Sequence, residues 1–499
     1  MQQYISPLAG KKAMKADLFS RNYIRRLYFD PTIKIDPVKS GTSGHRGIAG
    51  KGFNFRHVEA LTQACVDLSI KNGHYGPKYE EITPKQNLGG IIIGRDVRYL
   101  SDFALKSAVK VLAGNEIPTI MQSETGIAPT PVISLMIHKL NRENNANYQG
   151  IIITASHNPP EEGGIKTNGL DGGPNTQTKI IDELANDILN NQQRIKKTNN
   201  LNIQEMDLRD IYVKELKNVV DMDAIKSSGI PFVASPLGGS AGGYYNYINS
   251  FYGTKIIEVL GEPDPQGKSR TYDWDGKLRG DPSSKYVMKA IEGIKEKYHS
   301  PIAFANDNDA DRFGAVDSTG SLNPNHILCV IADYLCKHRN FDLYKGIGRS
   351  IGTTHMLDSI AQKYGRPIYE VPVGFKWYVD GLLKGKYLIA GEESAGLIVP
   401  RIDGSLWVTE KDGIVANLLM MEIISKYGKD IGNLYKELEK EHGVYHYERI
   451  DYKASKNEKE RLKQLSNDEN EVKRLLSGKK IAGKEIINVR CGDGIKITL

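Results

Sequence analysis

Cysteine is scarce in this chain of 499 residues. The four cysteines lie far apart and form no CxxC pair: Cys65, Cys329, Cys336 and Cys491. This spacing gives neither a disulfide framework nor a zinc site. We expect reduced thiols, which are typical of a cytoplasmic protein.

Long apolar runs are also missing from the chain. No stretch reaches the roughly 18 consecutive apolar residues that a membrane-spanning helix requires. Residues 1–20 mix lysines and polar residues with the apolar ones, so they lack the apolar segment of a signal peptide. We therefore predict no membrane partner and no secretory leader.

Charge of one sign does not dominate. The chain has 67 basic and 60 acidic residues, which give a formal net charge of +7, and they are spread without a basic arm or an aromatic-rich basic stripe. Nucleic acid is therefore not predicted as a partner, and anionic small molecules fit better. Neither the charge nor the composition indicates an oligomeric state.

The remaining composition is that of a globular protein of several domains. Hydrophobic residues make up 39% and charged residues 25% of the chain. A single core does not extend over so many residues, so we expect three or four domains of ordinary size.

Apolar periodicity predicts alternating helices and strands in the first 150 residues. Helical spacing of apolar residues covers 55–73 and 103–112, whereas 89–94 and 117–121 are short apolar runs typical of buried strands. Strands that alternate with helices indicate βαβ units and a largely parallel sheet. The fold class is therefore α/β.

Three apolar runs each end in a polar loop. Residues 151–153 lead into TASHNPP, residues 301–305 into NDNDADR, and residues 387–390 into GEESAG. In α/β folds, ligands bind where the carboxyl ends of strands deliver such loops. We predict three α/β domains and a smaller terminal unit, with the divisions 1–204, 205–320, 321–444 and 445–499. Within the last division, 453–480 is rich in Lys, Glu and Asn and predicts a solvated helix.

Ser156 follows the first of these strands and precedes a double proline. A serine held there by stiff neighbours suits a nucleophile or a carrier of a transferred group, although a helix cap remains an alternative. A serine hydrolase fits poorly. In an extended segment the side chains of Ser156 and His157 would point apart, and no GxSxG elbow is present.

Asp307, Asp309 and Asp311 alternate along the chain. In an extended conformation their carboxylates point to one side, where they would repel one another without a cation. Oxygen ligands of this kind suit Mg²⁺. An EF-hand is excluded because Arg312 and Ser318 occupy the positions of its Gly and Glu, and an acidic surface turn is the alternative.

Residues 40–47 contain three glycines and three hydroxyl side chains beside Arg46. Backbone N–H groups and a guanidinium of this kind can form an anion cradle. The loop is neither a Walker motif nor a GxGxxG motif, so a nucleotide site is not predicted. Lys166, ten residues after Ser156, could act as a point charge or as an acid–base group. Lys376 and Lys411 also follow strands but are unremarkable on their own.

Together these segments resemble a known family. GTSGHRG at 41–47, TASHNP at 154–159, DNDADR at 307–312 and GEESAG at 391–396 look like the motifs of the α-D-phosphohexomutases, the glucose-specific bacterial branch above all. GRDVR at 94–98, APTPV at 128–132 and VPVGFKW at 371–377 agree in order. The resemblance runs from about residue 39 to the end. It implies three similar α/β domains with mixed or parallel sheets around a central cleft, followed by an incomplete fourth α+β domain.

The resemblance also implies roles for individual residues. Ser156 would carry a phosphoryl group to and from a hexose phosphate through glucose 1,6-bisphosphate, interconverting glucose 1-phosphate and glucose 6-phosphate. Mg²⁺ would be held by Ser156, Asp307, Asp309 and Asp311. The remaining catalytic residues would be Arg46, His157 and Lys166. The substrate would contact Thr42, Ser43, Arg312, Gly374, Lys376, Glu392, Ser394 and Lys411.

One departure from the family pattern concerns the carboxyl terminus. The family's last domain carries a loop written RPSGT or close to it, which grips the phosphate that is not transferred, and no such loop occurs before Leu499. We therefore expect the fourth domain to be partial and activity to be reduced. The alternative to a working phosphoglucomutase is a catalytically impaired relative that binds sugar phosphate or a protein partner.

Overall fold

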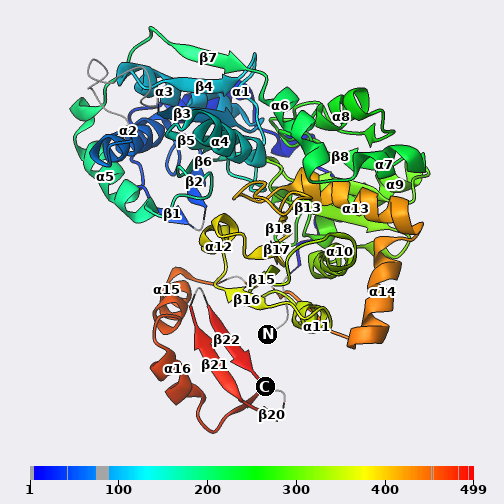
Figure 1. Ribbon diagram of the computed structural model, residues 1–499. Helices are drawn as coiled ribbons and strands as arrows, with labels where there is room; N and C mark the ends of the chain where they lie inside the picture. Colours follow the sequence, from blue (N-terminus) through cyan, green and yellow to red (C-terminus); the bar gives the residue numbers. More distant parts are fainter. Residues whose placement is uncertain are drawn as a thin grey trace.

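The protein contains three α/β units and a small carboxyl-terminal unit (Figure 1). The computed structural model describes residues 5–41, 43–74, 89–450, 452, 454–481, 483–492 and 494–499. Among these residues, no helix is both long enough and apolar enough to cross a bilayer.

The first unit is built on a mixed sheet in the order β1-β2-β6-β5-β3-β4-β7. Its strands are β1 (Ser40–Gly41), β2 (Gly44–Ile48), β3 (Gly90–Arg95), β4 (Thr119–Gln122), β5 (Tyr148–Ile153), β6 (Glu162–Asn168) and β7 (Ile203–Met206). Strands β5, β3, β4 and β7 are parallel, whereas β6, β2 and β1 are added in antiparallel pairs. The boundary predicted after residue 204 lies inside β7, which pairs with β4 and therefore belongs to this sheet.

Helices cover both faces of this sheet, as the all-apolar strands predict. Ile91 and Ile93 pack with one set of helices, while Ile92 packs with α4 on the opposite face, because side chains alternate along a strand. The helices are α1 (Arg21–Phe29), α2 (Phe55–Lys71), α3 (Tyr99–Gly114), α4 (Thr130–Asn144) and α5 (Thr178–Asn190), with a short 3₁₀ turn η2 (Gln192–Arg194). The predicted helices at 55–73 and 103–112 are thus confirmed as α2 and α3.

The second unit has a five-stranded sheet in the order β14-β13-β12-β8-β9 and a separate hairpin, β10-β11. Its strands are β8 (Val233–Ser235), β9 (Ile257–Glu258), β10 (Thr271–Tyr272), β11 (Leu278–Arg279), β12 (Ala303–Asn306), β13 (Phe313–Asp317) and β14 (Gly320–Ser321). Its helices are α6 (Leu208–Glu215), η3 (Leu216–Asn218), α7 (Met222–Ser228), α8 (Tyr244–Tyr252) and α9 (Lys285–Lys297).

The third unit has a four-stranded sheet in the order β16-β15-β17-β18. Its strands are β15 (Gly346–Ser350), β16 (Ile368–Val371), β17 (Tyr387–Glu392) and β18 (Gly396–Ile398). Its helices are α10 (Pro324–His338), α11 (Met356–Lys363), η4 (Phe375–Trp377), α12 (Val379–Leu383), α13 (Gly413–Tyr427) and α14 (Ile431–His442). One apolar core runs from α4 of the first unit through α6 and α8 to α13, so the three units pack as neighbours.

The carboxyl-terminal unit lies at the end of the third sheet (Figure 1). It contains α15 (Lys456–Leu465), α16 (Glu469–Leu476), β19 (Lys480–Ile481), β20 (Lys484–Glu485), β21 (Asn488–Cys491) and β22 (Ile495–Thr498). The single solvated helix predicted over 453–480 is wrong. Two helices form instead, because Asp468 caps a new helix by accepting a hydrogen bond from the backbone N–H of Glu471.

Residues 5–20, the amino-terminal arm, precede α1 and run alongside the β10-β11 hairpin of the second unit. The backbone N–H groups of Ser6, Gly10 and Ala13 donate to carbonyls of this hairpin segment at 2.7, 2.8 and 3.0 Å, and Met14 N–H donates to the Tyr272 hydroxyl at 3.0 Å. The arm includes the 3₁₀ turn η1 (Lys15–Asp17) and leads into α1 on the first unit. It therefore ties the second unit to the first.

Candidate active site between the serine and aspartate loops

Ser156 lies three residues beyond β5 in a tightly held loop. Its backbone is left-handed, with φ of 53°, a conformation that costs a non-glycine residue free energy and that neighbouring contacts must sustain. Ser156 N–H donates to the Thr154 hydroxyl at 2.8 Å, and the Arg98 guanidinium donates to the Ser156 carbonyl at 2.7 Å. Asp96 in turn holds both Arg98 and Thr154. No helix begins here, so the helix-cap interpretation is excluded.

The three predicted metal carboxylates converge on the loop that follows β12. Oxygens of Asp307, Asp309 and Asp311 lie within 4.8 Å of one another, and all three side chains are buried. The predicted extended conformation is wrong, however. The loop is a turn in which Ala310 has a left-handed φ of 54°, and it is this turn that gathers the carboxylates.

The serine hydroxyl and two lysines contact these carboxylates. Ser156 Oγ donates to Asp307 Oδ2 at 2.8 Å. Lys166 Nζ lies 2.6 Å from Asp309 Oδ2 and 2.9 Å from Asp311 Oδ2, while Lys411 Nζ also lies 2.9 Å from Asp311 Oδ2. The serine and aspartate loops, from different units, thus meet in one buried cluster.

The carboxylates fit a divalent ion. Oδ1 of Asp309 and Oδ1 of Asp311 are buried and have no hydrogen-bond partner among the described residues. Carboxylate oxygens are the ligands that Mg²⁺ prefers, and two of these three carboxylates have an oxygen without a partner in the described part of the chain. Carboxylates this close repel one another, and a cation among them reduces that repulsion. Burial, followed by the charges of Asp309 and Asp311, raises the pKa of Asp307 well above its ordinary value.

Lys166 is held as a cation in this cluster. Burial alone would lower its pKa, but the charges of Asp309 and Asp311 outweigh that effect and raise the pKa above its ordinary value. Lys166 lies on β6, whose neighbour β2 carries Arg46 opposite Gly164. Arg46 donates to the Ser43 hydroxyl at 2.9 Å, so the predicted anion loop is adjacent to the lysine strand. Thr42, predicted to bind substrate, lies outside the described residues.

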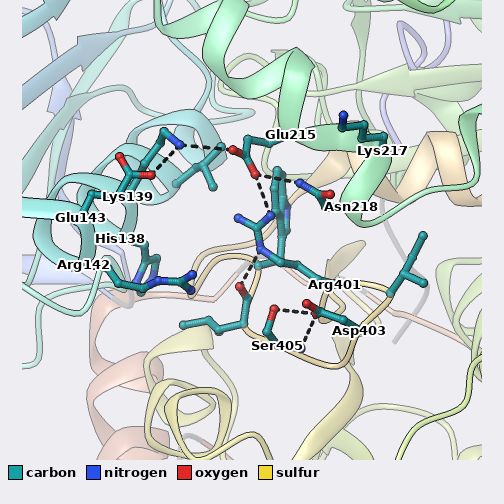
Figure 2. Close-up of a pocket in the computed structure, with 14 residues that line it drawn as sticks. His138, Lys139, Arg142, Glu143, Glu215, Lys217, Asn218, Arg401, Asp403 and Ser405 are labelled. Atoms are coloured by element: carbon teal, nitrogen blue, oxygen red, sulfur yellow. Dashed lines mark hydrogen bonds and ion pairs between the residues drawn. The ribbon is translucent and has the colours of Figure 1, made fainter.

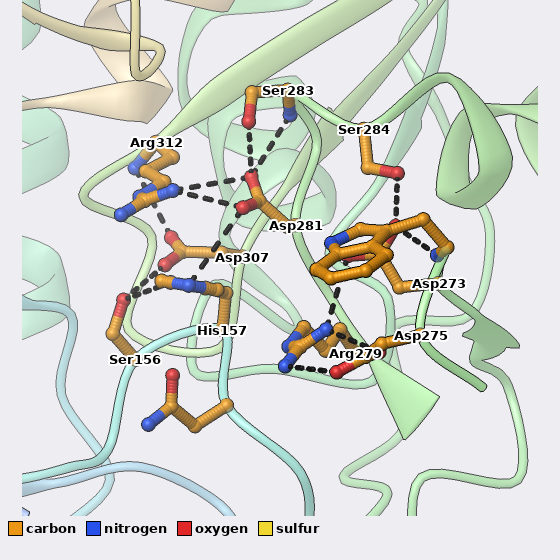
Figure 3. A network of polar contacts seen from close by, with 12 residues as sticks. Ser156, His157, Asp273, Asp275, Arg279, Asp281, Ser283, Ser284, Asp307 and Arg312 are labelled. Carbon is orange, nitrogen blue, oxygen red and sulfur yellow. Dashed lines mark hydrogen bonds and ion pairs between the residues drawn. The ribbon is translucent and has the colours of Figure 1, made fainter. Parts of the chain in front are cut away.

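His157 is turned toward Ser156 (Figure 3). The prediction that the two side chains point apart is wrong, because the left-handed backbone at Ser156 replaces the extended one. His157 Nδ1 lies 3.2 Å from Ser156 Oγ, and His157 Nε2 lies 3.7 Å from Asp281 Oδ2.

Asp281 also holds Arg312. The guanidinium donates to the two oxygens of Asp281 at 3.2 and 3.0 Å, and the Arg312 backbone N–H donates to Asp307 at 3.1 Å (Figure 3). Asp281 is thus a functional candidate that the sequence did not reveal, because it lies in no motif and follows a short hairpin. Thr130 is a second functional candidate of this kind, because its hydroxyl donates to Asp309 at 3.0 Å. It lies in the APTPV segment, for which the sequence predicted no role.

The predicted sugar loop lies at the end of β17 in the third unit. Glu392 is 4% exposed and accepts from the Gly374 backbone N–H at 2.7 Å and from the Ser394 hydroxyl at 3.1 Å. Lys376 lies on the same segment as Gly374, with its ammonium 5.0 Å from the Trp377 ring centre. These residues form a second group, away from the contacts of Ser156.

Lys411 connects the two groups. Its ammonium contacts Asp311 and lies 5.1 Å from the centre of the Phe375 ring, next to Gly374 and Lys376. Backbone hydrogen bonds reinforce this connection, since Phe313 N–H donates to the Ala395 carbonyl at 3.2 Å. The aspartate loop and the sugar loop are therefore fixed relative to each other.

Fold and site together bring a serine loop and a three-carboxylate loop from different α/β units into contact, an arrangement that suits an enzyme of phosphoryl transfer. Comparison with known families agrees. Residues 37–194, 210–320 and 323–442 match domains I, II and III of the phosphoglucomutase/phosphomannomutase family, each described as alpha/beta/alpha. The chain belongs to this family, the α-D-phosphohexomutases.

Individual relatives extend over most of the chain. A protein of Komagataeibacter xylinus named phosphoglucomutase is 39% identical over 482 residues, covering 93% of this chain and 84% of the relative. Phosphoglucomutase 1 of Saccharomyces cerevisiae is 29% identical over 466 residues, covering 85% and 76%. The structure described as a putative phosphomannomutase from Thermus thermophilus superposes with a TM-score of 0.68 at 26% identity, covering 85% and 88%.

Proposed function

We propose that this protein is a phosphoglucomutase that interconverts α-D-glucose 1-phosphate and glucose 6-phosphate. The observation that carries the proposal is the contact between Ser156 and Asp307 at 2.8 Å, in which a serine from the first unit meets a three-carboxylate loop of the second. Ser156 is only 1% exposed, so a phosphoryl group on its oxygen would be shielded from hydrolysis by bulk water. The name of the K. xylinus relative supports glucose as the sugar.

Ser156 would carry the phosphoryl group in each transfer. In the first step the bond between phosphorus and Ser156 Oγ breaks as phosphorus bonds to the free hydroxyl oxygen of the hexose phosphate. The proton of that hydroxyl is delivered to Ser156 Oγ, which leaves a serine hydroxyl and a glucose 1,6-bisphosphate. Lys166 and His157 are the side chains placed to hold or move this proton.

Asp307, Asp309 and Asp311 would hold Mg²⁺ together with an oxygen of phosphorylated Ser156. When bound, the ion supplies positive charge that neutralises the phosphoryl oxygens. The cations of this chain provide the remaining charge. Arg46 and Arg312 are each anchored by a partner of their own, Ser43 and Asp281.

The sugar would lie between the serine loop and the third unit. Glu392 and Ser394 present a carboxylate and a hydroxyl for sugar hydroxyls, and Lys376 offers a cation for the phosphate that is not transferred. Lys411 lies between these residues and the aspartate loop. After the first transfer the bisphosphate would turn around and return its other phosphoryl group to Ser156 by the reverse step.

A coupled assay tests this function. Purified protein is supplied with glucose 1-phosphate, Mg²⁺ and a trace of glucose 1,6-bisphosphate, and the formation of glucose 6-phosphate is followed. We expect turnover by the natural chain and none by Ser156→Ala. Well-folded protein without turnover would favour the alternative, a sugar-phosphate-binding relative. Intact mass would then show whether Ser156 carries phosphate.

A further inference from the structure

A cavity lies where the three α/β units meet (Figure 2). Its volume is about 600 Å³, within the range of small-molecule sites. The last turns of α4 form one wall, the end of α6 and η3 form another, and the loop 401–407 forms the third. The opposite end of α4 carries Thr130 at the active site, so the helix separates the two sites by roughly 15–18 Å.

Some of the cationic side chains that line this cavity have no partner among the described residues. Glu215 is engaged by Lys139 at 3.2 Å, by Arg401 at 2.7 Å and by the Asn218 amide at 2.9 Å. In contrast, Arg142 and Lys217 form no side-chain hydrogen bond or ion pair with any residue in the described part of the chain.

The overall balance of the lining is positive. Four cations, Lys139, Arg142, Lys217 and Arg401, face three acids, Glu143, Glu215 and Asp403. Hydrogen bonds from Ser405, reinforced by the charges of Arg401 and Arg142, lower the pKa of Asp403. Arg142 and Arg401 line the cavity from different walls, α4 and the loop 401–407. Two guanidiniums so arranged suit a phosphate.

The other polar groups of the lining suit hydroxyls. Asn218, Asp403 and Ser405 offer amide, carboxylate and hydroxyl groups around the cations (Figure 2). A nucleobase fits less well. Trp407 is the sole aromatic ring in the lining, apart from the imidazole of His138; it is 1% exposed, and the Arg401 guanidinium covers it at 5.1 Å.

The cavity is connected to the active site by a short segment, 401–411. Trp407 Nε1 donates to Asp412 at 2.9 Å, and His138 Nε2 lies 2.9 Å from the Thr409 hydroxyl. Two residues after Thr409, Lys411 contacts Asp311. A molecule bound between Arg401 and α4 would therefore restrict the motion of the segment 401–411, whose last residue contacts the aspartate loop.

We propose that this cavity is a second, non-catalytic site for a small phosphorylated sugar or polyol, whose phosphate is held by Arg142, Lys217 and Arg401. The occupant links the three units and holds the segment 401–411 in place. Nothing in this assignment depends on the reaction at Ser156.

Calorimetric titration of the full chain with sorbitol 6-phosphate tests the site. The titration uses protein whose Ser156 carries no phosphate, in buffer without Mg²⁺, so no phosphoryl group is transferred to the free hydroxyls of the probe. We expect two binding events in the natural chain. Arg142→Ala/Lys217→Ala should weaken one of them by at least about tenfold, whereas Arg46→Ala/Arg312→Ala should remove only the other. Unchanged binding in the first variant, or complete loss in the second, would overturn the proposal.

Two further measurements separate charge from recognition. The control variant Lys255→Ala/Lys436→Ala lacks two exposed cations that lie away from the cavity, and it should bind sorbitol 6-phosphate like the natural chain. If this variant also lost the cavity binding event, the binding would depend only on the net charge of the protein. Inorganic phosphate should bind the cavity more weakly than sorbitol 6-phosphate. Equal affinity would contradict the hydroxyl contacts.

Hydrogen exchange tests whether the bound molecule restricts the motion of the segment 401–411. In the Arg46→Ala/Arg312→Ala background, where only the cavity binds, sorbitol 6-phosphate should slow exchange in 401–411. The protection should vanish when Arg142→Ala/Lys217→Ala is added. Binding without any protection of this segment would refute the claim that the occupant holds it in place.

Discussion

The cleft at Ser156 and the joint between the third unit and the carboxyl-terminal unit use the same kind of ion pair in opposite surroundings. In the cleft, Lys166 is 3% exposed and lies 2.6 Å from Asp309, which is fully buried. At the joint, Arg490 and Lys496 lie 2.7 and 2.9 Å from Glu370. The Arg490 side chain is 61% exposed, and those of Lys496 and Glu370 keep 21% and 18% of their surface in contact with water. The distances are nearly equal.

Burial makes the difference between these pairs. Removing one partner of a buried pair costs about 3–5 kcal/mol, because the other charge is left without compensation. An exposed pair contributes about 0–1 kcal/mol, since water solvates either charge once they separate. The cleft is therefore rigid and sensitive to substitution, whereas the carboxyl-terminal unit is loosely tied.

The largest effect is expected at Ser156. Ser156→Ala removes the carrier oxygen and should lower kcat by at least about 10⁴-fold in the coupled assay. The melting temperature should change little, because the variant loses only the hydroxyl contacts with Asp307 and His157. Ser250→Ala, which removes an exposed hydroxyl on α8 of the second unit, is the matched control. Activity of Ser156→Ala within tenfold of the natural chain would disprove the carrier role.

Lys166→Met should follow, with a loss of about 10²–10³-fold in kcat. Without the ammonium, Asp309 and Asp311 face each other with less compensation, so the metal-free variant should also unfold at lower temperature. Mg²⁺ should raise its melting temperature more than that of the natural chain, and a chelator should reverse this. Equal shifts in both proteins, measured by calorimetry, would show that the lysine and the ion do not share a site.

Asp281→Asn should lower kcat by about 10–100-fold, because Arg312 and His157 lose the carboxylate that orients them. The KM for glucose 1-phosphate should change less than kcat if the effect is on transfer geometry. Asp281→Glu should recover part of the activity, which a purely structural role would not predict. Asp275→Asn, on the neighbouring hairpin, serves as a comparison.

Glu370→Gln should have the smallest effect, with kcat changed by less than about threefold. Although burial opposes it, ion pairing with Lys496 and Arg349 lowers the pKa of Glu370 to about 2. Its stabilising contribution is therefore complete above the ordinary pKa of 4.5 and is lost as the pH falls toward 2. Limited proteolysis between the two units should show this pH dependence in the natural chain and not in Glu370→Gln.

Much of the fold was predictable because its strands are buried on both faces. The apolar run at 89–94 and the periodicity of 55–73 required no knowledge of distant partners, and both elements formed as expected. The meeting of Ser156 with the aspartates was predictable only from the family resemblance. Each loop follows the end of a strand, but the strands β5 and β12 belong to different sheets, so the rule for one sheet edge does not bring the loops together.

What the sequence did not predict depends on backbone turns and distant polar contacts. The left-handed conformations of Ser156 and Ala310 have no glycine to signal them, so the direction of His157 and the shape of the aspartate loop were misjudged. Asp281 finds Arg312 across 31 positions, and a hydrogen-bonded pair of this separation leaves no periodic pattern. The three-unit cavity combines α4 with a loop more than 250 residues later, for the same reason.

The amino-terminal arm has a consequence for the order in which the protein can assemble. Met14 reaches its partner Tyr272 across 258 positions, so the ribosome must add all of these residues before the contact can form. Because synthesis adds roughly 5–20 residues per second, the arm remains without this partner for roughly 13–50 s after it is made. Helices and hairpins form in a much shorter time. The segment that is synthesised first is thus attached late, and the first unit is pinned to the second only after the β10-β11 hairpin has emerged.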